Sequence, residues 1–330
     1  MKLAWPIEIA GTGSCTPARI VTNDEFSKQV DTSNEWIVQR TGIRERRLAA
    51  PEESTLTMAT GAASAALADA RLTPADLDLI VVATITPEHQ LPATACELQA
   101  VLGCRWIPAF DLAAACSGFV WGFISAAQYV VSGMADTALV VGSECLSRIT
   151  DPQDRGTCIL FGDAAGAAVI RRARDSARSV LAVRMGADGH RGMLIHVPAG
   201  GSREPATLRT VNERLHYMRM QGREVYKFAV TQMHETLRET CADAGVSVQD
   251  LALVIPHQSN LRIIELACQK AGVPLERVAI NIDRYGNTSA ASVAVALHEA
   301  RQQGRCQPGD LVMLLAFGAG LTWGSILLRV

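Results

Sequence analysis

The chain has 330 residues, of which 48% are apolar and 5% aromatic, and a formal net charge of -2 at pH 7. This length can bury a large core in one domain or two, and the composition is that of a globular protein rather than a disordered one. The nearly balanced charge argues against a general nucleic-acid binder.

The nine cysteines and seven histidines bear on the compartment and on metal binding. The cysteines are scattered without a Cys-x-x-Cys pair, and the histidines show no His-x-x-x-His spacing. We therefore expect reduced thiols in a cytoplasmic protein, with no disulfide framework, no metal and no bound cofactor. The first eight residues include Pro6 and Glu8 and lack the apolar length of a signal peptide.

Near the N-terminus, a glycine-containing segment reads Gly11-Thr-Gly13-Ser-Cys-Thr-Pro17. It begins like a dinucleotide-binding loop, but the third glycine is absent and a proline follows. We predict a tight turn here rather than a phosphate-binding site.

From residue 79 onward the sequence alternates between strand and helix patterns. Short apolar runs between turn residues predict strands, and longer apolar runs with helical spacing predict helices. This alternation predicts a sheet that is covered by helices on both faces. The expected elements are a strand at 79–83, a helix at 92–102, a strand at 107–112, a helix after Cys116 and a strand at 137–141.

Two segments depart from this alternation. Residues 112–135 contain no charged side chain and are long enough to span a membrane. Gly118, Gly122 and Gly133 interrupt the run, so we interpret it as a helix buried at the centre of a soluble protein. Residues 199–220 carry mixed charge, and we expect an excursion or lid between two halves of the chain.

An internal repeat relates the two halves. Residues 68–81 resemble residues 242–255, since both give a helix end, a turn, an Asp-Leu-x-Leu entry and a buried strand. Residues 111–116 correspond in the same way to 283–288, where we expect a strand end that leads into a helix. A duplicated α/β unit explains this pattern. We divide the chain into an N-terminal half, 1–175, and a C-terminal half, 176–330.

Three chemically capable residues stand at strand-to-helix turns. Cys116 precedes an apolar helix, where backbone N–H groups and the helix dipole favour a thiolate. His257 and Asn287 occupy comparable turns in the second half. Ligands of open α/β sheets bind at the carboxyl ends of strands, so these three side chains are expected to converge there. Together they are the parts of a site that handles thioesters.

Each of these residues also has an ordinary structural explanation. A cysteine in an apolar stretch is usually a small core residue, which we expect for Cys145, Cys158, Cys241 and Cys268. The histidine could cap a helix, and the asparagine could be a helix N-cap. The three positions indicate a catalytic site only when they are taken together.

With these residues identified, the chain resembles the β-ketoacyl-acyl carrier protein synthase III family, the initiating condensing enzymes of bacterial fatty-acid synthesis. The likeness extends from Ile9 to Ser325. It rests on Asp31-Thr-Ser-Asn-Glu-Trp36-Ile-Val-Gln-Arg40-Thr-Gly-Ile-Arg44, Ala113-Ala-Ala-Cys116, Asp154-Arg155-Gly-Thr157, His257-Gln-Ser-Asn-Leu-Arg262 and Gly286-Asn287-Thr-Ser-Ala-Ala-Ser292. The resemblance implies a thiolase-like α/β fold, duplicated in αβαβα layers, and a homodimer.

The resemblance also implies roles for the reacting groups. Cys116 would attack the acyl-CoA thioester and carry the acyl group. His257 and Asn287 would bind the malonyl thioester oxygen and stabilise the enolate formed on decarboxylation. The backbone N–H groups of Cys116 and Ala319 would form the oxyanion hole of the acyl step, and Phe317 would cover the site and favour loss of carbon dioxide.

Further positions match the family's substrate contacts. Trp36 and Arg155 would hold the adenine of CoA between them, and the rest of the CoA tunnel would involve Arg40, Tyr226 and Asn260. Arg262 and Lys227 would belong to the basic patch that meets the acidic carrier protein, although such side chains can equally form a solvated face.

Several residues depart from the family pattern. Leu91 stands where some members place a phenylalanine that closes the acyl pocket from the partner subunit. Ala164 and Ala319 replace glycines, and Tyr226 replaces a phenylalanine. An alanine at 319 keeps its N–H, provided that its backbone angle suits a Cβ.

The resemblance implies a decarboxylative condensation of a short acyl-CoA, acetyl-CoA or similar, with malonyl-acyl carrier protein. No nucleic acid or membrane would be a partner. An alternative is a related secondary-metabolism ketosynthase or acyltransferase that uses a longer or aromatic acyl-CoA and shares the Cys-His-Asn set. A catalytically inactive partner subunit is a third possibility, against which the retention of Cys116, His257 and Asn287 argues.

Overall fold

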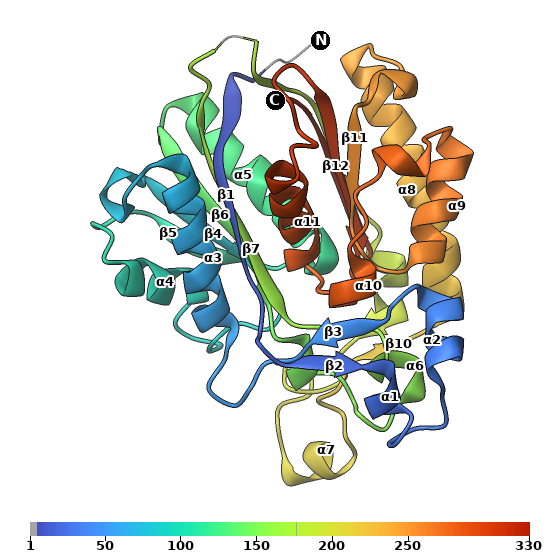
Figure 1. Ribbon diagram of the computed structural model, residues 1–330. Coiled ribbons are helices and arrows are strands. Elements are labelled where there is room, and N and C mark those ends of the chain that lie inside the picture. Colours follow the sequence, from blue (N-terminus) through green and yellow to red (C-terminus); the bar gives the residue numbers. More distant parts are fainter. Residues whose placement is uncertain (1–4, 176) are drawn as a thin grey trace.

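The computed structural model describes residues 5–175 and 177–330. Figure 1 shows two sheets side by side, each flanked by helices on both faces. The first sheet has the strand order β1-β7-β6-β4-β5, and the second has the order β11-β12-β13-β8. The strands of the first sheet are β1 (Ile7–Cys15), β4 (Leu79–Ala83), β5 (Ala109–Leu112), β6 (Thr137–Glu144) and β7 (Ala164–Arg172), and those of the second are β8 (Ser179–Ala187), β11 (Leu253–Pro256), β12 (Leu311–Gly318) and β13 (Thr322–Arg329).

Two helices, α5 (Gly118–Ser132) and α11 (Ala291–Gln302), fill the layer between the sheets. The outer face of the first sheet is covered by α3 (Thr55–Ala70) and α4 (Thr94–Leu102). The outer face of the second is covered by α8 (Gly222–Ala244) and α9 (Leu261–Ala271). This is the αβαβα layer order that the family resemblance implies.

Strand β4 illustrates why its sequence is apolar throughout. Leu79 and Val81 pack into the central layer with α5 and α11. Ile80 and Val82 face the opposite way, into the core beneath α3. Because helices cover both faces of the sheet, every position of the strand is buried, and no polar alternation remains.

Helix α5 lies in the most apolar part of the sequence. By length and composition alone, Ala115–Ser132 could cross a membrane. Phe119, Val120 and Phe123 are fully buried, and they pack with residues of both sheets. The segment is therefore the central core helix that the sequence analysis predicted.

The predicted turn at residues 11–17 is wrong, because β1 runs through most of that segment to Cys15. A Cβ at Gly11 would lie 2.4 Å from the carbonyl oxygen of Ala66 in α3, and one at Gly13 would lie 2.3 Å from that of Ala62. The two glycines thus allow the helix backbone to pack directly against the strand. Their spacing reflects helix packing and not a phosphate-binding loop.

The internal repeat is visible as two equivalent units. Helix α3 leads through a short turn into β4, and α8 leads through a similar turn into β11. Both strands are parallel to a neighbour in their own sheet. One detail differs from expectation: Asp283 lies in a short helix, α10 (Ile282–Tyr285), and not at a strand end.

The remaining elements lie around the lower edge in Figure 1. They include the 199–220 segment, which carries α7 and returns through β10 to pair with β9. The elements are β2 (Ile20–Thr22), α1 (Asn23–Phe26), α2 (Asn34–Thr41), β3 (Glu45–Arg47), α6 (Arg155–Cys158), β9 (Ile195–His196), α7 (Leu208–Asn212) and β10 (Arg219–Met220). Met218 and Met220, at the end of this excursion, line the central cavity.

Candidate active site

Cys116 lies in a 3-10 turn, Ala115–Ser117, between the end of β5 and the first residue of α5. Ala115 has a φ of 45°, an uncommon value for a residue with a side chain. Gly318, at the end of β12, packs against this turn, since a Cβ there would lie 2.7 Å from the Cys116 nitrogen. The close approach brings the next residue, Ala319, beside the cysteine.

Burial, the largest effect, raises the pKa of the Cys116 thiol to about 12, and the nearby Glu144 carboxylate adds to the increase. The Ser289 hydroxyl and the backbone N–H groups of Cys116 and Ala319 act in the opposite direction and lower the pKa. The helix-start position is confirmed, but the thiolate predicted from it is wrong for the resting protein. The cysteine must lose its proton during the reaction.

His257 follows β11 and is 1% exposed. Its Nδ1 lies 2.6 Å from the Ser292 hydroxyl, which also accepts the Gln258 N–H at 3.4 Å. We assign the hydroxyl as the donor to Nδ1, which leaves the proton of the neutral ring on Nε2. Burial lowers the pKa of His257 to about 3, so the ring stays neutral and can donate a hydrogen bond.

Asn287 is held in place by backbone and side-chain hydrogen bonds. Its N–H donates to the Leu160 carbonyl at 2.8 Å, and its carbonyl accepts from the Gly162 N–H at 3.0 Å. The side-chain oxygen accepts the Ser289 N–H at 2.9 Å. Because that oxygen is occupied, the amide NH₂ is the group available to a ligand.

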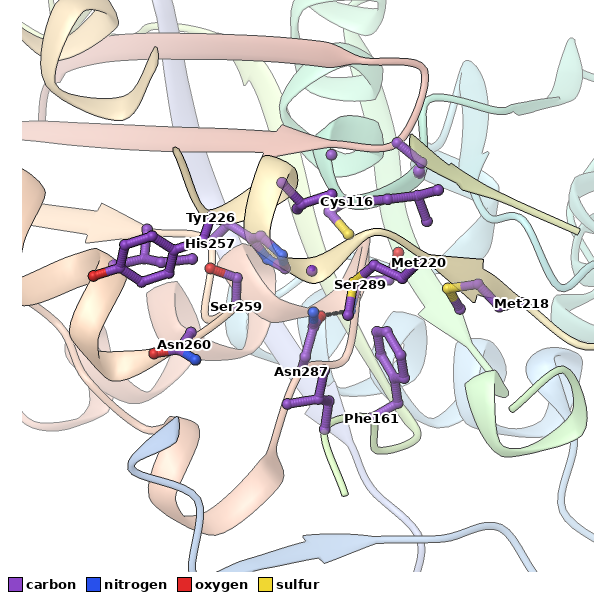
Figure 2. A pocket seen from close by; sticks show the side chains of 18 of the residues that line it. Cys116, Phe161, Met218, Met220, Tyr226, His257, Ser259, Asn260, Asn287 and Ser289 are labelled. Atoms are coloured by element: carbon purple, nitrogen blue, oxygen red, sulfur yellow. Dashed lines mark hydrogen bonds between the residues drawn. The ribbon is translucent and has the colours of Figure 1, made fainter. Parts of the chain in front are cut away.

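The three side chains line one cavity of about 360 Å³. Figure 2 shows Cys116, His257 and Asn287 around it, from different parts of the chain. Its lining also includes the predicted residues Trp36, Arg40, Tyr226, Asn260, Phe317 and Ala319. The Phe317 ring meets the His257 ring edge to face, with centroids 5.4 Å apart.

Alanine at position 319 is compatible with the backbone. The described residues other than glycine that have a positive φ are Arg71, Ala115, Arg214 and Ser289, so Ala319 requires no left-handed conformation. Its N–H lies close enough to the Cys116 sulfur to lower the pKa of the thiol. The departure from glycine therefore leaves this donor in place.

Cationic side chains surround Trp36 at one end of the cavity. The Arg155 guanidinium lies 4.8 Å from the centre of the Trp36 ring, and that of Arg40 lies 5.6 Å away. Arg155 also donates to the backbone carbonyl of Asp31 at 2.8 Å. An adenine ring between Trp36 and Arg155 would need more space than this separation provides, so Arg155 must move to admit it. Asn260 donates to the Arg40 carbonyl at 3.1 Å.

The other predicted residues lie outside the cavity. Leu91 is 87% exposed. Arg262 is exposed in the first turn of α9, and its N–H donates to Asn260. Lys227 is exposed in α8 and forms a surface ion pair with Glu224 at 2.9 Å.

The sequence analysis missed the apolar end of the cavity and the polar support of the site. The apolar lining includes Ile85, Leu146, Phe161, Ile195 and Met218. Ser289, Ser292 and Glu144 support the reacting groups. Both serines stand in the motif that identified Asn287, and Glu144 is a charged residue at the end of an apolar strand, so each carried a signal.

Within residues 5–175 and 177–330, no group of three or more His, Cys, Asp or Glu side chains is placed to hold a metal ion. The chemistry available in the cavity is that of a thiol, two N–H donors from side chains and two from the backbone. Such a set suits the formation of a thioester and the stabilisation of an oxyanion or enolate.

Comparison with known proteins places this geometry in context. The family model of "3-Oxoacyl-[acyl-carrier-protein (ACP)] synthase III" matches residues 110–189, and that of its C-terminal part matches residues 241–330. A β-ketoacyl-[acyl-carrier-protein] synthase III of Symbiobacterium thermophilum is 49% identical over 324 residues, covering 98% of each chain.

Two solved structures are also similar over nearly the whole chain. The 3-oxoacyl-[acyl-carrier-protein] synthase III of Aquifex aeolicus has a TM-score of 0.92 and 47% identity, covering 98% of this chain and all of its own. The priming β-ketosynthase of the R1128 polyketide biosynthetic pathway has a TM-score of 0.90 and 35% identity, covering 99% of this chain and 97% of its own. These structures bear out the thiolase-like fold.

Proposed function

The chain belongs to the β-ketoacyl-[acyl-carrier-protein] synthase III family, and we propose that Cys116, His257 and Asn287 carry out its reaction. The protein is an acyl-transferring enzyme that condenses an acyl-CoA with malonyl-acyl carrier protein to initiate fatty-acid synthesis. The observation that supports this assignment most strongly is the convergence of these three side chains on one cavity, in a chain 49% identical to a named synthase III.

In the first half-reaction, the Cys116 sulfur attacks the carbonyl carbon of the acyl-CoA thioester. The N–H groups of Cys116 and Ala319 lie beside the sulfur and would stabilise the oxyanion that forms on the attacked carbonyl. The bond to the CoA sulfur then breaks, and protonated CoA leaves. The acyl group remains on Cys116 as a thioester.

In the second half-reaction, malonyl-acyl carrier protein occupies the same cavity. His257 donates from Nε2 and Asn287 donates from its amide to the malonyl thioester oxygen, so that the enolate is stabilised when carbon dioxide leaves. Phe317 packs on His257 and keeps water away from the carboxylate. The enolate carbon attacks the acyl-Cys116 carbonyl, which forms the new carbon–carbon bond and releases the thiolate of Cys116. The thiolate then takes up a proton from water, which restores the resting thiol.

The acyl-CoA and malonyl-acyl carrier protein substrates would enter the cavity past four residues that line it, Trp36, Arg40, Tyr226 and Asn260. Arg155 would leave its place on Trp36 and close over the adenine of CoA. Arg262, together with Lys227, would meet the acidic carrier protein at the mouth. We also propose that the enzyme is cytoplasmic, where its substrates would be available.

We propose a homodimer in which Leu91 of one chain closes the acyl pocket of the other. Leu91 is too exposed in a single chain to have a structural role there. Strand β5 lies at the edge of the first sheet, so its outer backbone groups are open to pairing with a second copy.

We propose a short primer such as acetyl-CoA, as the family resemblance implies. Met218 and Met220 line the cavity, and methionine side chains adapt readily to ligands of different shape. Together with the similarity to a priming β-ketosynthase of a polyketide pathway, this supports a second candidate: condensation of a longer or aromatic acyl-CoA.

One experiment tests the function and separates the two candidates. The protein is incubated with malonyl-acyl carrier protein and, in turn, acetyl-, butyryl-, octanoyl- and benzoyl-CoA, and the mass of the carrier protein is measured. We expect a β-ketoacyl product with the highest rate from acetyl-CoA. A maximum at a longer or aromatic primer would favour the second candidate, and the absence of any β-ketoacyl product would contradict both.

A further inference from the structure

Glu144 is a fully buried carboxyl group at the last position of β6. It accepts hydrogen bonds from the Thr86 hydroxyl at 2.6 Å, the Thr84 hydroxyl at 3.2 Å and the Ile85 N–H at 3.1 Å. The Ser289 hydroxyl donates to its other oxygen at 3.1 Å. All of these partners are neutral, so none of them balances the charge of the ionised carboxylate.

Ser289 connects this carboxyl group to the nucleophile. Its hydroxyl donates to Glu144 at 3.1 Å, and Ser289 lines the same cavity as Cys116, where its hydroxyl acts to lower the pKa of the thiol. The residue has a φ of 48° and is 1% exposed, so its side chain is held in an uncommon backbone conformation within the core. Figure 2 shows Ser289 between Asn287 and Cys116.

Cys116 requires a proton acceptor, because its thiol is neutral in the resting protein. The neighbouring His257 is poorly suited to that role. Its Nδ1 is occupied by the Ser292 hydroxyl, its Nε2 carries the proton that the malonyl thioester needs, and burial keeps the ring from taking a second proton. A different group must accept the thiol proton.

We propose that Glu144 accepts the proton of Cys116 through the Ser289 hydroxyl. This inference rests on the proposed function and assigns a proton relay to its first half-reaction. The Cys116 S–H proton passes to the Ser289 oxygen while the Ser289 O–H proton passes to Glu144, and the sulfur electron pair attacks the acyl-CoA carbonyl. When the bond to the CoA sulfur breaks, the same proton returns from Glu144 through Ser289 to the CoA thiolate. Protons and electrons balance within the half-reaction.

The surroundings suit a carboxylate that gains and loses a proton near neutral pH. Burial raises the pKa of Glu144 to about 7, against the opposing effect of its four hydrogen-bond donors. The titratable groups nearby are Cys116, across Ser289, and Cys145, the next residue along the chain. Cys145 is influenced in turn by Asp163 and Arg148. Both cysteines have pKa values raised to about 12, so Glu144 is the group of this cluster that titrates near neutrality.

The test measures single-turnover acylation of Cys116 by acetyl-CoA from pH 5 to pH 9, read by intact mass. In the unmodified protein, the rate should fall as the pH decreases below about 7, because Glu144 becomes protonated. Glu144→Gln and Ser289→Ala should each lose roughly 10²-fold in this rate, the lower range for general base catalysis, and should lose this inflection. Glu144→Asp keeps the carboxylate and should recover part of the rate.

Two further measurements separate a relay from a structural role. Release of carbon dioxide from malonyl-acyl carrier protein depends on His257 and Asn287, so Glu144→Gln should keep it within about threefold. Ser143→Ala is the matched control, because Ser143 is buried beside Glu144 on β6 but donates to the Thr55 carbonyl, away from the cavity. The Ser143→Ala variant should be acylated at the same rate as the unmodified protein and with the same pH profile.

The outcomes are distinguishable from a failure of the proposed function. If no acyl-CoA acylates the unmodified protein, the proposed function fails. If the unmodified protein is acylated and Glu144→Gln and Ser289→Ala match its rate and pH profile, the relay is overturned. Equal losses of acylation and decarboxylation in Glu144→Gln, without recovery in Glu144→Asp, would also overturn it and would leave Glu144 with a structural role only.

Discussion

The Ser292 hydroxyl lies 2.6 Å from Nδ1 of His257, inside the core and away from the cavity. This contact fixes which ring nitrogen carries the proton, and so decides whether the histidine donates or accepts in the cavity. A residue on the first turn of α11 thereby controls a side chain that follows β11.

We predict that Ser292→Ala retains acylation of Cys116 and slows decarboxylation of malonyl-acyl carrier protein. Without the hydroxyl, the ring can take the other tautomer and lose its donor. The loss should approach the roughly 10²–10³-fold expected on removing one such donor, as in Asn287→Ala. Ser292→Thr keeps the hydroxyl and is the control. Carbon dioxide release gives the answer, and an unaffected rate in Ser292→Ala would show that Ser292 does not set the tautomer.

We predict that Arg262→Glu raises the KM of malonyl-acyl carrier protein more than the KM of the acyl-CoA. Arg262 is exposed at the start of α9, and an exposed charge acts mainly on encounter with an acidic partner, an effect that salt screens. The measurement is the KM of each substrate at low and high salt. Lys270→Glu, at the other end of the same helix, is the control and should leave both values unchanged. Equal effects of Arg262→Glu on the two substrates would remove Arg262 from the docking surface.

We predict that the stability of Glu144→Gln relative to the unmodified protein increases with pH. Burial raises the pKa of Glu144 from its ordinary value of 4.5 to about 7, so the folded state binds more protons between these values and loses stability as the pH rises through them. At about 1.4 kcal/mol per pKa unit, the variant should gain roughly 3 kcal/mol on the unmodified protein between about pH 4.5 and pH 8.

Urea denaturation at several pH values measures this difference. Glu299→Gln is a control of opposite sign, because the ion pair with Arg284 contributes to a lowered pKa for Glu299. Its removal should therefore destabilise the protein by a roughly constant amount above about pH 4.5, and by less as the pH falls below that value. A pH-independent difference for Glu144→Gln would mean that the pKa of this carboxyl group is not shifted.

We predict that Leu91 reaches across a dimer interface and limits the length of the acyl primer that the enzyme accepts. Leu91→Phe should narrow the range toward acetyl-CoA and Leu91→Ala should widen it, by the roughly 1–3 kcal/mol that one methylene is worth in an apolar pocket. Condensation rates for C2 to C8 primers decide this. Leu208→Phe alters another highly exposed leucine, in α7, and should not change the ranking. If neither Leu91 variant changes it, another residue closes the pocket.

The sequence pattern predicted most of the central strands and helices and a sheet covered on both faces, because buried strands and core helices have strong apolar patterns. The order of the five layers followed from the family resemblance. The misassigned segments have a physical reason. Gly11 and Gly13 imitate a turn, but they are glycines because α3 packs directly on β1. Asp283 corresponds in the repeat to Asp111 in β5, but its segment closes into the short helix α10.

At the site, the sequence identified Cys116, His257 and Asn287 but predicted the wrong ionisation of the thiol. The helix start favours a thiolate, and nothing local reveals that burial, with a smaller contribution from Glu144 at the end of β6, opposes it. The pKa of a buried group depends on contacts far apart in the sequence, as with Ser289 and Glu144, which are 145 residues apart. Motif reasoning names the reacting groups and misses the groups that control their protons.

The most direct test of the central claim is the intact mass of the protein after incubation with acetyl-CoA, for the unmodified chain and for Cys116→Ala. The account predicts that the unmodified protein gains one acetyl group, located on the peptide that contains Cys116, and transfers it when malonyl-acyl carrier protein is added. The folded Cys116→Ala variant should gain no mass. An equal gain in both proteins, or an acetyl group on another residue that is competent for transfer, would contradict Cys116 as the nucleophile.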